Sequence, residues 1–169
     1  MQAISTRDSK SINWSTVIMC ALGFWLSGSL VLDCLIVPGM LTTGMMNEPG
    51  FASAGYVMFG AFNHIELLCA ATVLTGCLVY RFADCFNQRV SFKTVLTAAA
   101  LLAIALVYTY IFTPQMSSAG MPLDVFATAK AASASMTVMH LVYWSLEATK
   151  LVFAALLLRT FFRKSCSLA

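Results

Sequence analysis

Charged side chains are scarce in this chain of 169 residues, where Lys, Arg, Asp and Glu make up 10% and hydrophobic residues make up 60%. Soluble domains carry about 25% charged residues, so this composition excludes an ordinary water-soluble globule. Disorder is excluded as well, because disordered chains combine low hydrophobicity with high net charge. The net charge is only +3 and the basic residues are scattered, which argues against a nucleic-acid-binding protein. The sequence therefore predicts a membrane protein.

The chain also lacks the motifs that mark soluble catalytic centres. It contains no GxSxG, HExxH or GxGxxG pattern and no phosphate-binding loop with Gly-Lys-Ser/Thr. Its six cysteines form no CxxC spacing and four of them lie inside apolar runs, which favours buried thiols over disulfides or a thiolate metal site. These absences favour a protein that is not an enzyme.

Four long apolar runs account for most of the sequence, namely residues 14–38, 55–80, 94–112 and 133–158. At 1.5 Å per residue, each run can cross a hydrocarbon core of about 30 Å as a helix. The runs do not alternate as barrel strands do, and an isolated span in lipid must satisfy its backbone internally. Pro38 is expected to end the first helix.

We therefore expect an all-α integral membrane four-helix bundle with up-down-up-down topology. Its single domain covers residues 14–160, between a polar lead at 1–13 and a tail at 161–169. The polar lead is followed by an apolar run that is too long for a signal peptide, so no cleaved signal is expected.

Basic residues are distributed unevenly between the connections. Eight of them lie before the first run, between the second and third, or after the fourth, whereas only Lys130 lies in the other two connections. The positive-inside rule then places both termini in the cytoplasm. The connections around Met45 and Met116 are expected on the other face of a bacterial cytoplasmic or thylakoid membrane.

A small set of polar residues interrupts the apolar runs: Asp33, Asn63, His64, Glu66, His140, Glu147 and Lys150. An ionisable side chain near the centre of a span costs roughly 2.5–3.5 kcal/mol on insertion scales. We therefore expect these side chains to face the interior of the bundle.

Two of these residues, Glu147 and Lys150, are three positions apart and are predicted to form an intrahelical ion pair. In the structural interpretation, Lys150 then extends towards the cytoplasm. In the functional interpretation, the pair belongs to a proton or ion pathway.

The second run places its polar residues on two faces. His64 and Glu66 are two positions apart and should point in nearly opposite directions, whereas Asn63 and Glu66 share a face. Either Asn63 or a neighbouring helix is expected to hold Glu66. Asp33 has no cation nearby in the sequence, and its expected partner is His64 or His140, as a carboxylate–imidazole pair.

Two cofactors are compatible with these residues. His64 and His140, from two different helices, predict axial ligation of haem b as one alternative. Copper is the other, because eight of the ten methionines lie in the outer loops or outer half, and thioether sulfur suits Cu(I). The residues proposed for metal are His64, His140, Met45, Met46, Met116, Met121 and Met136. A flexible apolar filling role for the methionines is the simpler alternative.

The chain resembles the TMEM205-like / DUF4149 family of four-span membrane proteins over about residues 14–160. The similarity is carried by Gly28-Ser29-Leu30-Val31-Leu32-Asp33, by Ile36-Val37-Pro38-Gly39-Met40, by Gly44-Met45-Met46, by Gly55-Tyr56, by Phe62-Asn63-His64-Ile65-Glu66-Leu67-Leu68, and by His140, Ser145, Glu147 and Lys150. It implies a bacterial and perhaps cyanobacterial member. A wider copper-resistance-D-like group of four-span proteins includes haem- and copper-associated members, which implies the same two cofactors.

Three functions remain open from the sequence. The leading hypothesis is an accessory or assembly partner of a larger membrane complex, with the lipid bilayer and a complex or a second copy as partners. The alternatives are a haem- or copper-binding membrane protein in copper handling or electron transfer, and a small proton-coupled transporter that uses Asp33, Glu147 and Lys150.

Overall fold

The computed structural model describes residues 13–44, 51–82, 90–115 and 133–166, and within these ranges the chain forms helices without any strand. The first rod consists of α1 (Trp14–Val31), the π-helical turn η1 (Leu32–Ile36) and α2 (Val37–Thr42). The second rod is α3 (Phe51–Phe82). The third joins α4 (Phe92–Val107) to a second π-helical turn, η3 (Tyr108–Phe112), and the fourth is α6 (Ser133–Cys166).

Each rod contains a segment that is long and apolar enough to cross a membrane. These segments are Trp14–Met40, Ser53–Phe82, Phe92–Gln115 and Leu141–Arg163. The predicted all-helical class is therefore confirmed for the described residues, and four helices have the length and hydropathy that the predicted spans require. The helices begin earlier or end later than the apolar runs, because a helix continues into polar flanks once its hydrogen-bond ladder is established.

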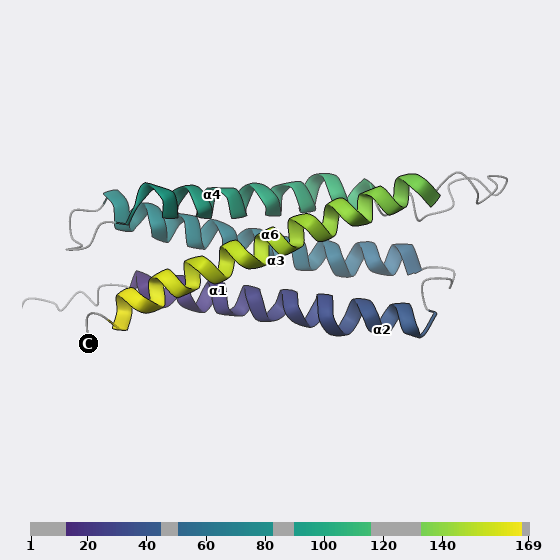
Figure 1. Ribbon diagram of the computed structural model, residues 1–169, viewed down its shortest axis with the longest axis horizontal. Helices are drawn as coiled ribbons and strands as arrows, with labels where there is room; N and C mark the ends of the chain where they lie inside the picture. Colours follow the sequence, from purple (N-terminus) through teal and green to yellow (C-terminus); the bar gives the residue numbers. More distant parts are fainter. Residues whose placement is uncertain (1–12, 45–50, 83–89, 116–132, 167–169) are drawn as a thin grey trace, which may run out of the picture.

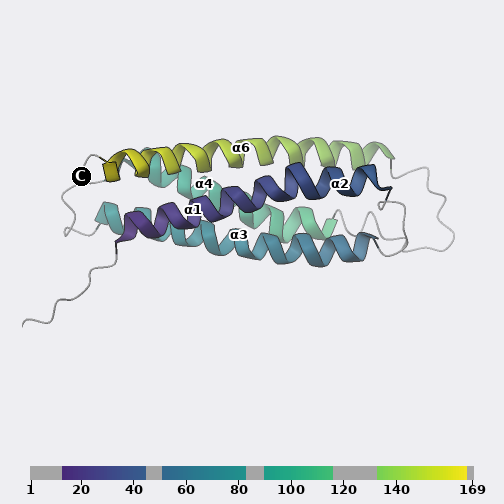
Figure 2. The ribbon, with the colours of Figure 1, turned by 90° about the horizontal axis from the view of Figure 1, so that it is seen from below.

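The four rods run antiparallel and form a closed ring in which α1 contacts α3 and α6, and α4 contacts the same two helices. Successive rods alternate in direction, as expected for an up-down-up-down bundle (Figures 1 and 2). In Figure 1, α6 crosses the bundle obliquely, from a position near α4 at its start to one near α1 at its end.

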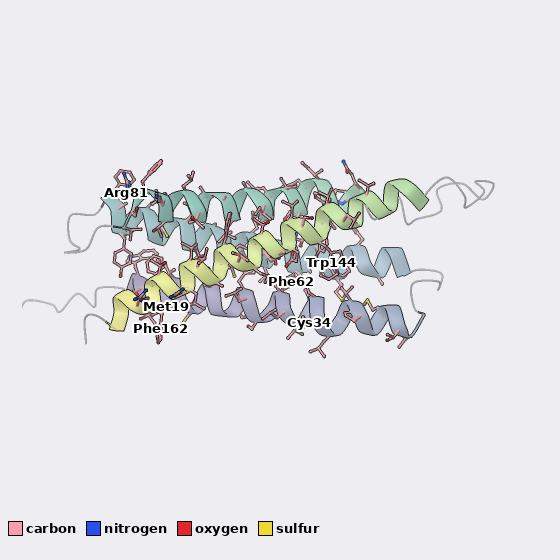
Figure 3. The ribbon with its side chains drawn as sticks, viewed as in Figure 1. Met19, Cys34, Phe62, Arg81, Trp144 and Phe162 are labelled. Atoms are coloured by element: carbon pink, nitrogen blue, oxygen red, sulfur yellow. The ribbon has the colours of Figure 1, made fainter. Side chains whose placement is uncertain are left out.

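Two ends of the bundle can be distinguished by charge. We call the end at which α1 and α4 begin and α3 and α6 finish the basic end, because Arg81, Lys93, Arg159 and Arg163 lie there. Figure 3 places Arg81 at this end, and its guanidinium lies 5.2 Å from the centre of the Phe92 ring. The opposite end, which contains α2 and the starts of α3 and α6, is called the distal end.

The prediction that Pro38 ends the first helix is wrong, because the helix continues through α2 to Thr42. A proline inside a helix removes one donor and its ring collides with the carbonyl four residues earlier. Here the wider turn η1 precedes Pro38, and Val37 N–H donates to Leu32 O, five residues back. A π-helical turn of this kind shifts the local hydrogen-bond register and accommodates the ring.

The apolar core occupies the half of the bundle nearer the basic end. Its members come from all four rods and include Ile18, Leu22, Val73, Cys77, Ala98, Leu101, Ala154 and Leu157. Many large apolar side chains elsewhere point outwards, such as Leu35 at 67% and Leu68 at 69% exposure, as a lipid-facing surface requires. Cys34 and Phe162 lie on the outside of the bundle in Figure 3.

Candidate functional site

Four ionisable side chains meet inside the bundle beyond this apolar core. Asp33 comes from η1, Glu66 from α3, and Glu147 and Lys150 from α6. All four are buried, with 7%, 1%, 2% and 3% of their surfaces exposed. We call these four residues the charged cluster. It brings together three carboxyl groups and one ammonium group from three different helices.

Lys150 is the centre of the cluster. Its Nζ donates to Glu66 Oε1 at 2.5 Å and lies 2.7 Å from Glu147 Oε1. The ammonium also lies 5.3 Å from the centre of the Tyr108 ring, over its face, and such a contact is stabilising when the cation is shielded from water. Lys150 therefore connects α6 to α3 and to the third rod.

Glu66 is the best-satisfied acid in the cluster. Its Oε1 accepts hydrogen bonds from Trp25 Nε1 at 2.8 Å and Ser29 Oγ at 3.0 Å, in addition to Lys150. Three donors on one oxygen, one of them charged, satisfy that oxygen and fix the orientation of the side chain. Its other oxygen, Oε2, is buried without a hydrogen-bond partner.

Asp33 and Glu147 have a different environment. Their carboxyl groups lie within hydrogen-bonding reach of one another. Asp33 Oδ2 and both oxygens of Glu147 are buried without a donor, since Lys150 approaches Glu147 at ion-pair distance but outside hydrogen-bond geometry. Two carboxyl groups in contact can hydrogen-bond only if one of them keeps a proton. We call Asp33 and Glu147 the carboxyl pair.

A second polar layer lies beside the cluster on its distal side. Asn63 Nδ2 donates to Thr113 Oγ1 at 2.5 Å, and Thr109 Oγ1 donates to Ala105 O at 2.8 Å and lies 3.4 Å from Asn63 O. Tyr108 Oη donates to Tyr143 O at 3.2 Å. Both π-helical turns contribute to the site. The turn η1 supplies Asp33 to the charged cluster, and η3 supplies Tyr108 and Thr109 beside it.

Several predictions for the second rod and for α6 are confirmed. Glu147 and Lys150 form the intrahelical pair, His64 and Glu66 point to opposite sides, and Asn63 and Glu66 are both buried on one face. A neighbouring helix holds Glu66, whereas Asn63 bonds to Thr113.

One other prediction is wrong, and a second is wrong for one of its two alternatives. Lys150 does not extend towards the cytoplasm, because Glu66 and Glu147 retain it in the interior. Asp33 does not pair with His64, whose ring is exposed and whose Nδ1 lies 2.6 Å from Gly60 O in its own helix. The alternative partner, His140, has a side chain that lies outside the described ones. A single turn of α3 cannot direct both His64 and Glu66 inwards.

The residues proposed for haem or copper are not assembled by the described part of the chain. His64 faces outwards and does not fit an axial ligand inside the bundle. Within the described ranges, no group of three or more His, Cys, Asp or Glu is placed to hold a metal ion. The structure does not describe the side chains of Met136 and His140. The other four methionines proposed for metal, Met45, Met46, Met116 and Met121, are not among the described residues.

The sequence also contains site residues that were not singled out in advance: Trp25, Ser29, Tyr108 and Thr109. A signal for the first two was available, because Trp25, Ser29 and Asp33 follow one another at intervals of four and so share one stripe of the helix. Tyr108 and Thr109 carry no comparable pattern in the apolar third run.

Comparisons with known protein families, with curated proteins and with solved structures find no match for this chain. The resemblance to the TMEM205-like / DUF4149 family therefore stays a prediction. The fold and the charged cluster define a helical bundle that has four helices long and apolar enough to span a membrane and an ionisable site in its interior.

Proposed function

We propose that this protein binds and releases protons inside the membrane as a small proton-coupled carrier. The observation that supports this best is the excess of acid in the charged cluster. Three carboxylates face one ammonium group, which gives a formal charge of −2 if all of them are ionised. A net charge of this size is very costly where water is excluded, and binding a proton is the simplest way to reduce it.

The surroundings of the cluster support a proton over a metal ion as the bound species. Within the described part of the chain, Asp33 Oδ2 and both oxygens of Glu147 have no hydrogen-bond donor, and Lys150 occupies the position between Glu66 and Glu147 that a cation would take. Ionisable residues within membrane spans are typical of proton relays in pumps and transporters.

Proton flux into liposomes tests this function. The protein is reconstituted with a trapped pH-sensitive dye, and a potassium gradient with valinomycin supplies the driving potential. We expect acidification faster than in protein-free liposomes, and we expect Asp33→Asn and Glu147→Gln to abolish the difference. Cys34→Ala is the matched control, because Cys34 neighbours Asp33 but is exposed. Flux that is unchanged in both cluster variants would contradict the proposal.

A second candidate function is the accessory or assembly partner of a larger membrane complex. It is favoured by the position of Lys150, which joins three of the four rods and so makes the cluster a structural fastener. This role predicts that Asp33→Asn, Glu66→Gln and Glu147→Gln lower the abundance of the protein or the retention of its partners. Normal abundance and co-purification, together with lost flux, would decide for the carrier.

The orientation belongs to the same proposal. The basic end is placed in the cytoplasm by the positive-inside rule, and the distal end then faces the periplasm or a thylakoid lumen. A bacterial cytoplasmic or thylakoid membrane is the proposed location, in agreement with the family that the chain resembles.

A further inference from the structure

The geometry points to a carboxyl pair, Asp33 and Glu147, that holds one exchangeable proton and exchanges it with the distal end of the bundle only. This inference deepens the proposed function and depends on it. It assigns different roles to the three acids of the cluster and states from which end of the bundle the site exchanges its proton.

The first step is the contrast between Glu66 and the carboxyl pair. Glu66 Oε1 receives Trp25, Ser29 and Lys150, so its charge is balanced and its orientation is fixed from α1 and α6. Asp33 and Glu147 receive no donor on the three buried oxygens described above, although both residues are more than nine-tenths buried. Lys150 reaches Glu147 Oε1 at ion-pair distance, and the two carboxyl groups can hydrogen-bond to one another only by sharing a proton. Glu66 with Lys150 is therefore the fixed ion pair, and Asp33 with Glu147 is the proton-binding pair.

The second step is the seal on the basic side. Between the cluster and the basic end, the interior is filled by the apolar core, in which Ile18, Leu22, Val73, Ala98 and Leu101 are each 0% exposed. A packed interior made of aliphatic side chains contains no polar groups that would hold water or pass a proton. Proton exchange with the basic end is therefore blocked in this conformation.

The third step is the polar layer on the distal side. Here the neighbouring interior groups are polar, namely Asn63, Thr109 and Thr113, which are linked by the hydrogen bonds described above. Among the described side chains that lie beyond Asp33, Asn63, Thr109 and Glu147 towards the distal end, none is buried. The pair thus lies between an apolar interior on one side and the polar side chains of Asn63, Thr109 and Thr113 on the other.

Among the described side chains, the titratable and charged groups that face the carboxyl pair come from the other three elements packed around it. They are Glu66 on α3, Tyr108 on η3, and Tyr143 and Lys150 on α6. Of these, Glu66 and Lys150 form the fixed ion pair. The proton that binds comes from water at the distal end, joins one oxygen of the pair, and changes the formal charge of the cluster from −2 to −1.

Infrared difference spectroscopy on oriented proteoliposomes tests the inference, because a protonated carboxyl group has a C=O stretch that a carboxylate lacks. Vesicles carrying the full chain with a C-terminal tag are sorted by whether protease can reach the tag. The pH is then changed outside only. When the tag is inside, the distal end faces out, and we expect the carboxyl signal to follow the external pH directly. When the tag is outside, we expect it to follow only after nigericin equalises the internal pH.

Variants assign the signal to the pair. Asp33→Asn is expected to abolish it and Cys34→Ala, at an exposed neighbour of Asp33, to retain it, and Glu147→Gln replaces Asp33→Asn if that variant does not fold. A signal that follows the pH at the basic end, or at both ends equally, would overturn the inference while leaving a proton-binding function in place. Absence of any pH-dependent carboxyl signal would overturn both, and the flux assay would then also be expected to fail.

Discussion

At the scale of single residues, Lys150 is the group on which the charged cluster depends. It is the one cation within reach of Glu66 and Glu147 among the described residues, and it is 3% exposed. A buried ion pair contributes little net stability compared with apolar residues of the same shape, but removal of one partner leaves the other charge uncompensated.

Lys150→Met should therefore lower the free energy of unfolding by about 3–5 kcal/mol, measured by denaturation in mixed micelles. Lys93→Met is the control, because Lys93 is exposed at the start of α4, and it should have little effect. Adding Glu66→Gln to Lys150→Met should restore part of the loss. A single variant as stable as the native chain would show that the acids of the cluster do not need this ammonium.

Trp25 is a first-rod residue that holds Glu66 in place. Its indole Nε1 donates to Glu66 Oε1 at 2.8 Å and the side chain is 2% exposed. Trp25→Phe keeps an aromatic ring but removes the donor, so we expect a loss of about 1.5–3 kcal/mol, the range for hydrogen bonds to charged groups. Trp144, which is 45% exposed, provides the matched Trp144→Phe control. Equal melting temperatures for the two variants would contradict this role.

At the scale of helices, the contact between α1 and α3 depends on a close approach at Gly76. A Cβ at Gly76 would lie 2.6 Å from Ile18 Cδ1, whereas a Cβ at Gly60 in the same helix would have nothing within 4 Å. Gly76→Ala should therefore cost about 1–3 kcal/mol through overpacking, and Gly60→Ala should not. Thermal unfolding in detergent measures both, and Ile18→Val should relieve part of the Gly76→Ala defect if the clash is its cause.

The sequence predicts the existence of the four long helices but not the two π-helical turns within them. Hydropathy alone predicts four helices long enough to cross a membrane. A hydrocarbon core sets the length of a crossing segment and requires its backbone groups to be hydrogen-bonded within the helix. The turns η1 and η3 are not predictable in this way, since a single extra residue in a helical turn leaves no pattern in composition. The passage of the helix through Pro38 depends on η1 and was missed for that reason.

The sequence predicts which residues belong to the site better than it predicts which of them contact one another. All four residues of the charged cluster were among the expected inward-facing residues, because a charge in a span has a high cost wherever it lies. Helical spacing also separates His64 from Glu66. It does not specify which helices are neighbours, and Asp33 meets Glu147 because α6 packs beside the first rod. That adjacency is a property of the assembled bundle.

At the scale of the whole molecule, the two halves of the bundle differ in the polarity of their interior side chains. The half near the basic end has a closed apolar core, and the half near the distal end begins with polar side chains. The direction of this asymmetry in the membrane determines from which compartment the carboxyl pair exchanges its proton. A topology measurement therefore bears directly on the proposed mechanism.

The expected topology places the basic end, and with it both chain termini, in the cytoplasm. A green fluorescent protein fused after residue 169 should then fluoresce, and alkaline phosphatase fused at the same position should be inactive. Alkaline phosphatase fused after residue 119, in the connection between the third and fourth spans, should be active. The fusions after residues 119 and 169 control each other for expression. The reverse pattern would contradict the orientation without changing the bundle, and the same polar layer would then expose the carboxyl pair to cytoplasmic protons, so the direction of coupling would be inverted.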